Sequence, residues 1–192
     1  MDTLLFTIVI IGAGFLMILL ILLITLVGAY NSFIKLRNDL DEAKSSIDVM
    51  LKNRHSTIPN LVSAAKEYMR HETEIFDKIT KLREQALKST DDQTKMEYEN
   101  ELSTELSKLS VQINNYPELK ANTNIVHLQK SIVTLESKIS AARRNFNAAA
   151  KAYNNKIDRF PTNLLAMVLS FSRQSYLEFP EASADIDVGN LF

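Results

Sequence analysis

The sequence has no cysteine and only four glycines among its 192 residues. The lack of cysteine excludes a disulfide, a thiol nucleophile and a metal bound through sulfur, and it leaves the compartment undetermined. The glycines stand at positions 12, 14, 28 and 189, so residues 29–188 contain none. Because tight β-turns depend on glycine at positive φ, this long stretch favours helices over a β-fold.

An excess of charge of one sign is also lacking. Residues 30–192 carry 22 basic and 22 acidic side chains, and the last twelve residues hold three acids and no base. The small positive excess left in residues 30–180 is too mild and too evenly spread for a nucleic-acid surface. The soluble part has no glycine-rich phosphate loop, which excludes nucleotide hydrolysis of the P-loop kind. A Ser-His-Asp arrangement stays open, although no nucleophile-elbow pattern supports one.

One long apolar run is present, from Leu4 to Val27, and it holds no charged residue. As a helix the run would be about 36 Å long, against about 30 Å for the bilayer core. A cleaved signal peptide is an alternative, since Val27-Gly28-Ala29 resembles a cleavage site, and a buried core helix is another. The length, the apolar character of every face and the lack of a preceding basic residue favour a retained membrane anchor.

Charges beside this run predict its orientation. Only Asp2 and the α-amine precede it, whereas Lys35, Arg37 and Lys44 follow closely. The positive-inside rule therefore places the N-terminus outside and the large domain in the cytoplasm. The lipid bilayer is the first predicted partner.

The apolar periodicity after the run predicts an all-α protein, with the anchor followed by an antiparallel bundle of long helices. The expected divisions are an anchor at 1–29, a bundle at 30–180 and a mobile acidic tail at 181–192. One helix over about 30–88, kinked near Pro59, is favoured over two helices meeting at Ser56-Thr57, and nothing stops the anchor from continuing into it. Further helices are predicted at about 92–113, 122–159 and 164–171, with caps in residues 88–92 and at Asn122 or Thr123.

Two blocks of sequence resemble the LemA family of bacterial membrane proteins. The first block contains Tyr30-Asn31, Leu36-Arg37, Ala43, Ser46-Ile47-Asp48-Val49, Leu51-Lys52, Arg54, Ile58-Pro59-Asn60-Leu61-Val62, Lys66, Tyr68 and His71-Glu72. The second contains residues 116–122, Leu128-Gln129, Glu136, Ile139, Ala142-Arg143-Arg144, Phe146-Asn147, Tyr153-Asn154 and Phe160-Pro161. One departure is Lys44, where the family commonly carries an aromatic residue.

The resemblance implies a single-pass protein of the bacterial inner membrane with a cytoplasmic bundle. It does not imply an enzyme, because the family has no established catalytic activity. Members resemble scaffold or interaction proteins, sometimes associated with membrane organisation or envelope proteases. Homo-oligomers and a membrane-protein partner are therefore expected, without cofactor, metal or nucleic acid.

The polar residues of these motifs are the candidate interaction residues. They are Asn31, Arg37, Asp48, Arg54, Pro59, Asn60, His71, Glu72, Arg143, Asn147 and Asn154. Three asparagine pairs, 31 and 38, 53 and 60, and 147 and 154, are seven residues apart and so share a helix face. Such asparagines either fix the helix register or lie half-exposed beside the apolar seam. Asn60 is also a candidate to bond the backbone group that Pro59 frees.

An alternative function is a metal- or cofactor-binding bundle. Glu67 and His71 are four residues apart, with Glu72 and Glu74 nearby, and on a helix that spacing can hold one metal. The Glu-x-x-His pairs of carboxylate-bridged di-metal bundles do not occur. A membrane-anchored, self-associating scaffold without catalysis is therefore the favoured hypothesis.

Overall fold

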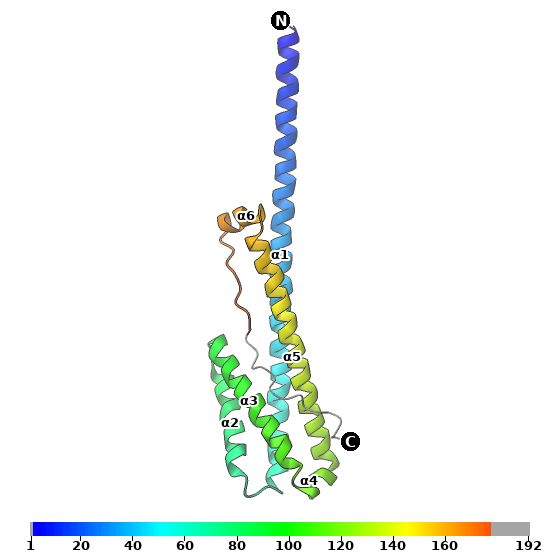
Figure 1. Ribbon diagram of the computed structural model, residues 1–192, viewed down its shortest axis with the longest axis vertical. Helices are drawn as coiled ribbons and strands as arrows, with labels where there is room; N and C mark the ends of the chain where they lie inside the picture. The colour runs from blue at the N-terminus through cyan, green and yellow to red at the C-terminus, as the bar shows by residue number, and fades with distance from the viewer. Residues whose placement is uncertain (1, 178–192) are drawn as a thin grey trace. The chain divides into compact units, whose positions relative to one another are not determined.

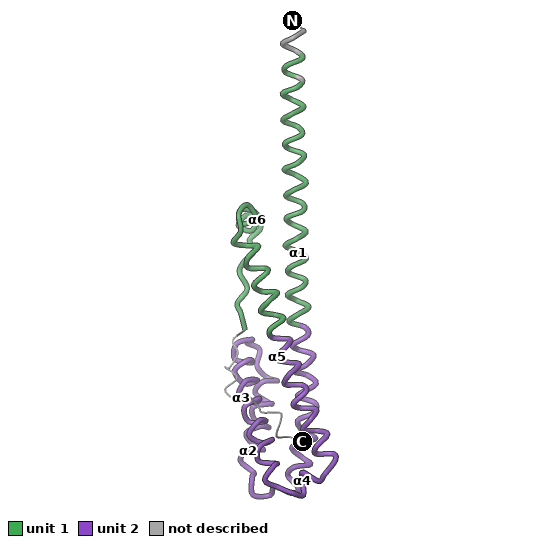
Figure 2. Tube along the Cα trace, turned by 45° about the vertical axis from the view of Figure 1, so that its right-hand side comes forward, with its two compact units in different colours: residues 1–44, 144–177 green, residues 45–143, 178–192 purple. Residues whose placement is uncertain are grey.

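The computed structural model describes residues 2–177, which fold as six helices without any β-strand (Figure 1). This confirms the all-α prediction, whereas the acidic tail at 181–192 lies outside the described residues. Two compact units share the chain, residues 2–44 with 144–177 (unit 1) and residues 45–143 (unit 2), as Figure 2 shows. The helices are α1 (Asp2–Lys66), α2 (Thr73–Lys88), α3 (Asp92–Ile113), α4 (Pro117–Ala121), α5 (Thr123–Asp158) and α6 (Thr162–Val168).

Helix α1 runs without interruption from the apolar segment into the following arm. The prediction that nothing stops the anchor is therefore confirmed, but the predicted helix over 30–88 is wrong about its end. Residues 67–72 form a turn, and α2 starts at Thr73. Met69 in this turn is buried in the core, and its backbone N–H donates to the Ala65 carbonyl over 3.0 Å. Core packing of Met69, with no glycine or proline nearby, accompanies this reversal of the chain.

Pro59 does not divide α1, so the alternative of two helices meeting at Ser56-Thr57 is also wrong. Proline has no N–H and leaves the carbonyl four residues earlier without its helical partner. That carbonyl belongs to His55, and Nε of Arg83 on α2 donates to it over 2.8 Å. The hydrogen-bond donor expected from Asn60 is therefore supplied by Arg83 of a neighbouring helix, and Asn60 itself is exposed.

Helices α3 and α5 begin at the predicted caps. Asp91 accepts the backbone N–H of Thr94 over 2.7 Å at the start of α3, and Asn122 accepts that of Asn124 over 3.0 Å at the start of α5. The short α4 was not predicted; proline occupies its first turn, and Leu119 anchors it in the core. Helix α6 ends at Val168, three residues before the predicted end, and Ser170 follows with a positive φ of 55°.

Unit 2 is an antiparallel bundle around one hydrophobic core. Each helix turns its apolar stripe inward, as the periodicity predicted. The core contains Ile58, Leu61, Val62, Ala65, Met69, Ile75, Phe76, Ile79, Leu82, Leu102, Leu106, Leu109, Ile113, Leu119, Ile125 and Ile132.

Unit 1 combines the apolar segment with a much smaller core. The described side chains of its apolar run are exposed, and this is the one helix in the described part of the chain that is long and apolar enough to cross a membrane. Below the run, Phe33 packs with Tyr153 of α5 and Ala166 of α6. The ring of Phe171 stacks on Phe33 with 4.9 Å between centroids. Residues 171–177 then run back along α5 as an extended strand-like segment, the strap (Figure 1).

Candidate functional site: a buried ion network and an asparagine clamp

Arg54 lies at the centre of a polar network inside unit 2. It occupies the apolar face of α1 between Leu51 and Ile58, and its side chain is completely buried. Nη2 donates to the carboxylate and the backbone carbonyl of Glu99 on α3. Nη1 donates to Glu136 of α5 and to the hydroxyl of Ser103, each over 2.6 Å. One guanidinium therefore joins three helices, and the fork of donors satisfies the charges that burial would otherwise penalise.

Glu99 is completely buried and has a second partner, because its other carboxylate oxygen lies 2.8 Å from Nε2 of His55. Burial alone would raise the pKa of Glu99, but the His55 hydrogen bond and the Arg54 charge outweigh it and hold the pKa below its usual range. Since the ionised carboxylate can only accept, Nε2 of His55 carries the proton. Glu99 is therefore a buried carboxylate that stays ionised.

Arg143 of α5 adds a second buried cation. Its Nη1 donates to the amide oxygen of Asn100 over 2.7 Å. Burial and the nearby Arg54 charge lower the pKa of Arg143, opposed by the charges of Glu136 and Glu99. Two arginines and two glutamates thus form a nearly neutral cluster, the arginine–glutamate network, defined by Arg54, Glu99, Glu136 and Arg143.

A hydroxyl and an imidazole lie within the network, those of Ser103 and His55. Ser103 donates to Glu136 over 2.9 Å and does not bond a histidine, and Nδ1 of His55 has no partner among the described residues. Ser103 is therefore not paired with an imidazole base, as nucleophilic catalysis by this hydroxyl would require. The arrangement fixes three helices in one register, which is what buried charged groups do best in a bundle.

A second polar feature lies in unit 1, where two predicted asparagines hold the strap. Nδ2 of Asn154 donates to the carbonyl of Gln174 and Oδ1 accepts its N–H, both over 2.8 Å. Asn147 makes the same pair of hydrogen bonds with Leu177, both over 2.9 Å. We call Asn147 and Asn154 the asparagine clamp.

The spacing of the clamp matches the two elements that it joins. Seven residues of helix rise by about 10.5 Å. Three residues of extended chain cover about 10 Å. Amides seven apart on α5 therefore reach backbone groups three apart on the strap, and the four hydrogen bonds go to backbone atoms. Asn147 and Asn154 therefore make fixed polar contacts, in this case with the strap. Asn31, Asn38, Asn53 and Asn60 are exposed.

The remaining candidate residues do not join either feature. Asp48 forms an exposed ion pair with Lys95 over 3.0 Å. Arg37 and His71 are exposed, and Glu72 accepts long hydrogen bonds from Gln112 and Tyr116, of 3.4 and 3.5 Å. Lys44, the departure from the family pattern, is exposed.

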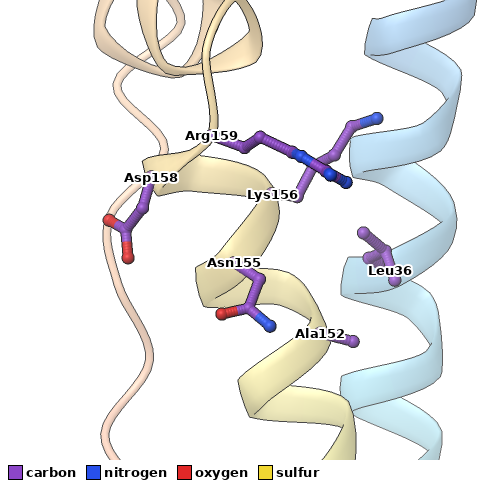
Figure 3. Close-up of a pocket in the computed structure, with 6 residues that line it drawn as sticks. All are labelled: Leu36, Ala152, Asn155, Lys156, Asp158 and Arg159. Carbon is purple, nitrogen blue, oxygen red and sulfur yellow. The ribbon is translucent and has the colours of Figure 1, made fainter.

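The metal hypothesis loses its geometric basis. Glu67 and His71 lie in the turn after α1, not on a helix, so their spacing does not place them on one face. In the described residues no three histidine, aspartate or glutamate side chains group as metal ligands. An open hollow in unit 1 lies elsewhere, lined by Leu36 of α1 and by Ala152, Asn155, Lys156, Asp158 and Arg159 (Figure 3).

Comparison with known proteins assigns the chain to a family. The LemA family model matches residues 43–189. The chain belongs to the LemA family. It is 28% identical over 167 residues to Protein LemA of Metamycoplasma hominis, covering 86% of this chain and 76% of that protein. It is 25% identical over 195 residues to Magnetosome protein MamQ 2 of Paramagnetospirillum magneticum. It is 24% identical over 195 residues to Magnetosome protein MamQ of Magnetospirillum gryphiswaldense. Each of these two alignments covers 88% of this chain and 72% of the relative.

The LemA match spans every member of the network and the clamp, yet sequence reasoning had missed Glu99, Ser103 and the role of Glu136. A signal for Glu99 was present: it precedes Leu102 by three residues and so lies on the apolar seam of α3. Arg143 lies on the seam of α5 in the same way, three residues before Phe146. A charged residue on an apolar seam indicates a buried partner, but the partner's identity depends on how the helices pack.

Proposed function

We propose that this LemA-family chain is a membrane-anchored helical scaffold that self-associates and has no catalytic activity. The observation that carries the proposal is the use of the motif polar residues. Arg54 and Arg143 are buried in the network, and Asn147 and Asn154 are bonded to the chain's own backbone. These groups hold helices and the strap in place and are not free to meet a substrate, as catalysis would need.

Long helices with exposed faces then remain as the contact surface. Val111 of α3 and Val133 of α5 are apolar and more than half exposed, and they are available for contact with another protein. A second copy of the chain is the partner that we favour, because most soluble oligomers join identical chains. A membrane-protein partner, including an envelope protease, is the alternative outcome.

The membrane in question is the bacterial inner membrane, with the bundle in the cytoplasm. Continuity of α1 supports a retained anchor, because the helix crosses Val27-Gly28-Ala29 without interruption. Lys35, Arg37 and Lys44 on the bundle side support the orientation. Labelling of a Val111→Cys variant by a membrane-impermeant maleimide in intact spheroplasts would contradict it.

Mass photometry of the full-length chain, gently solubilised with its anchor, tests self-association. We expect a discrete species several chains in mass that persists on dilution. A single detergent-bound chain at the highest accessible concentration would overturn self-association. In that case, crosslinking in cells would identify the other protein that the helix faces contact.

A further inference from the structure

Helix α6 exposes an apolar face that unit 1 does not cover. Residues 160–172 carry no charge. Leu164, Met167 and Val168 are 55%, 78% and 79% exposed and recur at the spacing of one helix face, and Phe160 is 76% exposed. Ala166, on the other side of α6, is buried against Phe33. A short uncharged helix therefore packs with one face and presents large apolar side chains on the other.

The place of α6 along α1 puts this face beside the bilayer. Phe33, which contacts α6, is six residues beyond Val27, or about 9 Å along the helix. The polar layer of a bilayer extends about 5–7 Å beyond the hydrocarbon core on each side. Exposed Tyr30 lies between the two levels, and tyrosine is enriched at this interface. Helix α6 lies across the end of α5 that points toward the apolar run of α1 (Figure 1).

Positive charge surrounds the same region. Residues 30–44 and 144–177 of unit 1 carry eight basic and four acidic side chains. Lys156 and Arg159 extend toward α1 above Leu36, whereas Asp158 points the other way (Figure 3). Asp158 pairs with Arg173 over 3.3 Å, and neither Lys156 nor Arg159 has a carboxylate partner within the described residues. Cations beside an apolar face are the combination that binds an anionic lipid surface.

We propose that α6 and the Phe160 turn insert into the headgroup layer of the bilayer that α1 enters, with Lys156 and Arg159 contacting anionic lipid. The bilayer is the occupant because the apolar face lies near the end of the apolar segment of α1, at the level of Phe33, and is bordered by positive charge. The proposal rests on α1 being a membrane anchor and not on self-association. Unit 1 would then hold the membrane at two points, by a spanning helix and an interfacial one.

The absence of cysteine makes this inference testable in the full-length protein. A single Met167→Cys variant carries an environment-sensitive fluorophore and is reconstituted in vesicles of equal parts phosphatidylcholine and phosphatidylglycerol. Leu87→Cys, an exposed apolar position in unit 2 that is not part of the proposed contact surface, is the matched control. We expect blue-shifted emission at position 167, quenched by lipids with a nitroxide near the headgroup, and water-like emission at position 87. Substituting Lys156→Gln and Arg159→Gln together should reduce the shift in these vesicles and leave it unchanged in pure phosphatidylcholine.

Three outcomes would overturn the inference or locate its failure. Water-like emission at position 167, in protein that floats with the vesicles, would show that α6 stays in solution. A blue shift that ignores nitroxide lipids and grows with the protein-to-lipid ratio would show that a second copy covers α6. Protein that does not float with vesicles would contradict the anchor itself, and with it the membrane part of the proposed function.

Discussion

The two units of this chain are held together in different ways. Unit 2 packs sixteen buried apolar residues in one cluster and encloses the arginine–glutamate network within its helices. Unit 1 buries fewer apolar residues: Phe33, Tyr153 and Ala166 form one cluster, and Leu40, Ala43, Phe146 and Ala150 are also buried. Its strap is held by the asparagine clamp through backbone atoms. The side chains at strap positions 172–176 are exposed.

This difference separates two kinds of specificity. In unit 2 each helix recognises the others through particular side chains, so the core fixes which residues face each other. In unit 1 the clamp forms hydrogen bonds with the extended backbone of the strap, so these bonds should depend little on which side chains the strap carries. Unit 2 should therefore respond strongly to core substitutions, and unit 1 to the two asparagines.

The largest expected effect comes from Arg54→Met. Removing the guanidinium leaves Glu99 buried without its main charge partner, which costs about 3–5 kcal/mol in the free energy of unfolding. Urea unfolding of the full-length chain in detergent, followed by circular dichroism, measures the loss. Arg70→Met is the matched control, because Arg70 is exposed in the turn after α1. A loss as small as that of the control would mean that the network contributes nothing to unit 2.

A fall in pH should weaken unit 2 through Glu99. Its pKa is lower in the folded chain than the ordinary value of 4.5, so the folded state binds the proton less readily. The resulting stability is fully present above about pH 4.5 and is lost as the pH falls through the folded pKa. Urea titrations across this range should show the wild type losing its advantage over a Glu99→Gln variant. An advantage that stays constant with pH would rule out this ionisation as its source.

A smaller and more local effect is expected in unit 1 from Asn154→Ala. The change removes two hydrogen bonds worth about 0.5–1.5 kcal/mol each, so the Gln174 amide should exchange its hydrogen at least about fivefold faster. Hydrogen exchange on the full-length chain measures this rate. Asn155→Ala, one position along and exposed, should leave it unchanged.

Gln174→Ala sharpens the comparison between the units. The clamp contacts only the backbone of this residue, so protection of the strap should survive the loss of its exposed side chain. If Gln174→Ala released the strap as much as Asn154→Ala does, recognition would depend on side chains, and the contrast with unit 2 would disappear.

Much of the fold could be predicted because its signals are local. The apolar run, the capping residues Asp91 and Asn122, and the seams of α3 and α5 each depend on a few neighbouring residues, and their helices begin where predicted. The end of α1 could not be predicted in this way. Proline at 59 is the obvious local breaker, yet Arg83 compensates for it, and the chain turns where Met69 enters the core.

The sequence by itself determined an all-α protein with one helix fit to span a membrane, since composition and helical periodicity act over short range, and its two motif blocks carried the resemblance to the LemA family. Only the tertiary structure decided what the polar motif residues do. Glu99 and Glu136 are 45 and 82 positions from Arg54, and Gln174 is 20 positions from Asn154. A charge or an amide becomes part of a site when packing brings its partner within hydrogen-bonding distance, and no spacing along the chain encodes that distance.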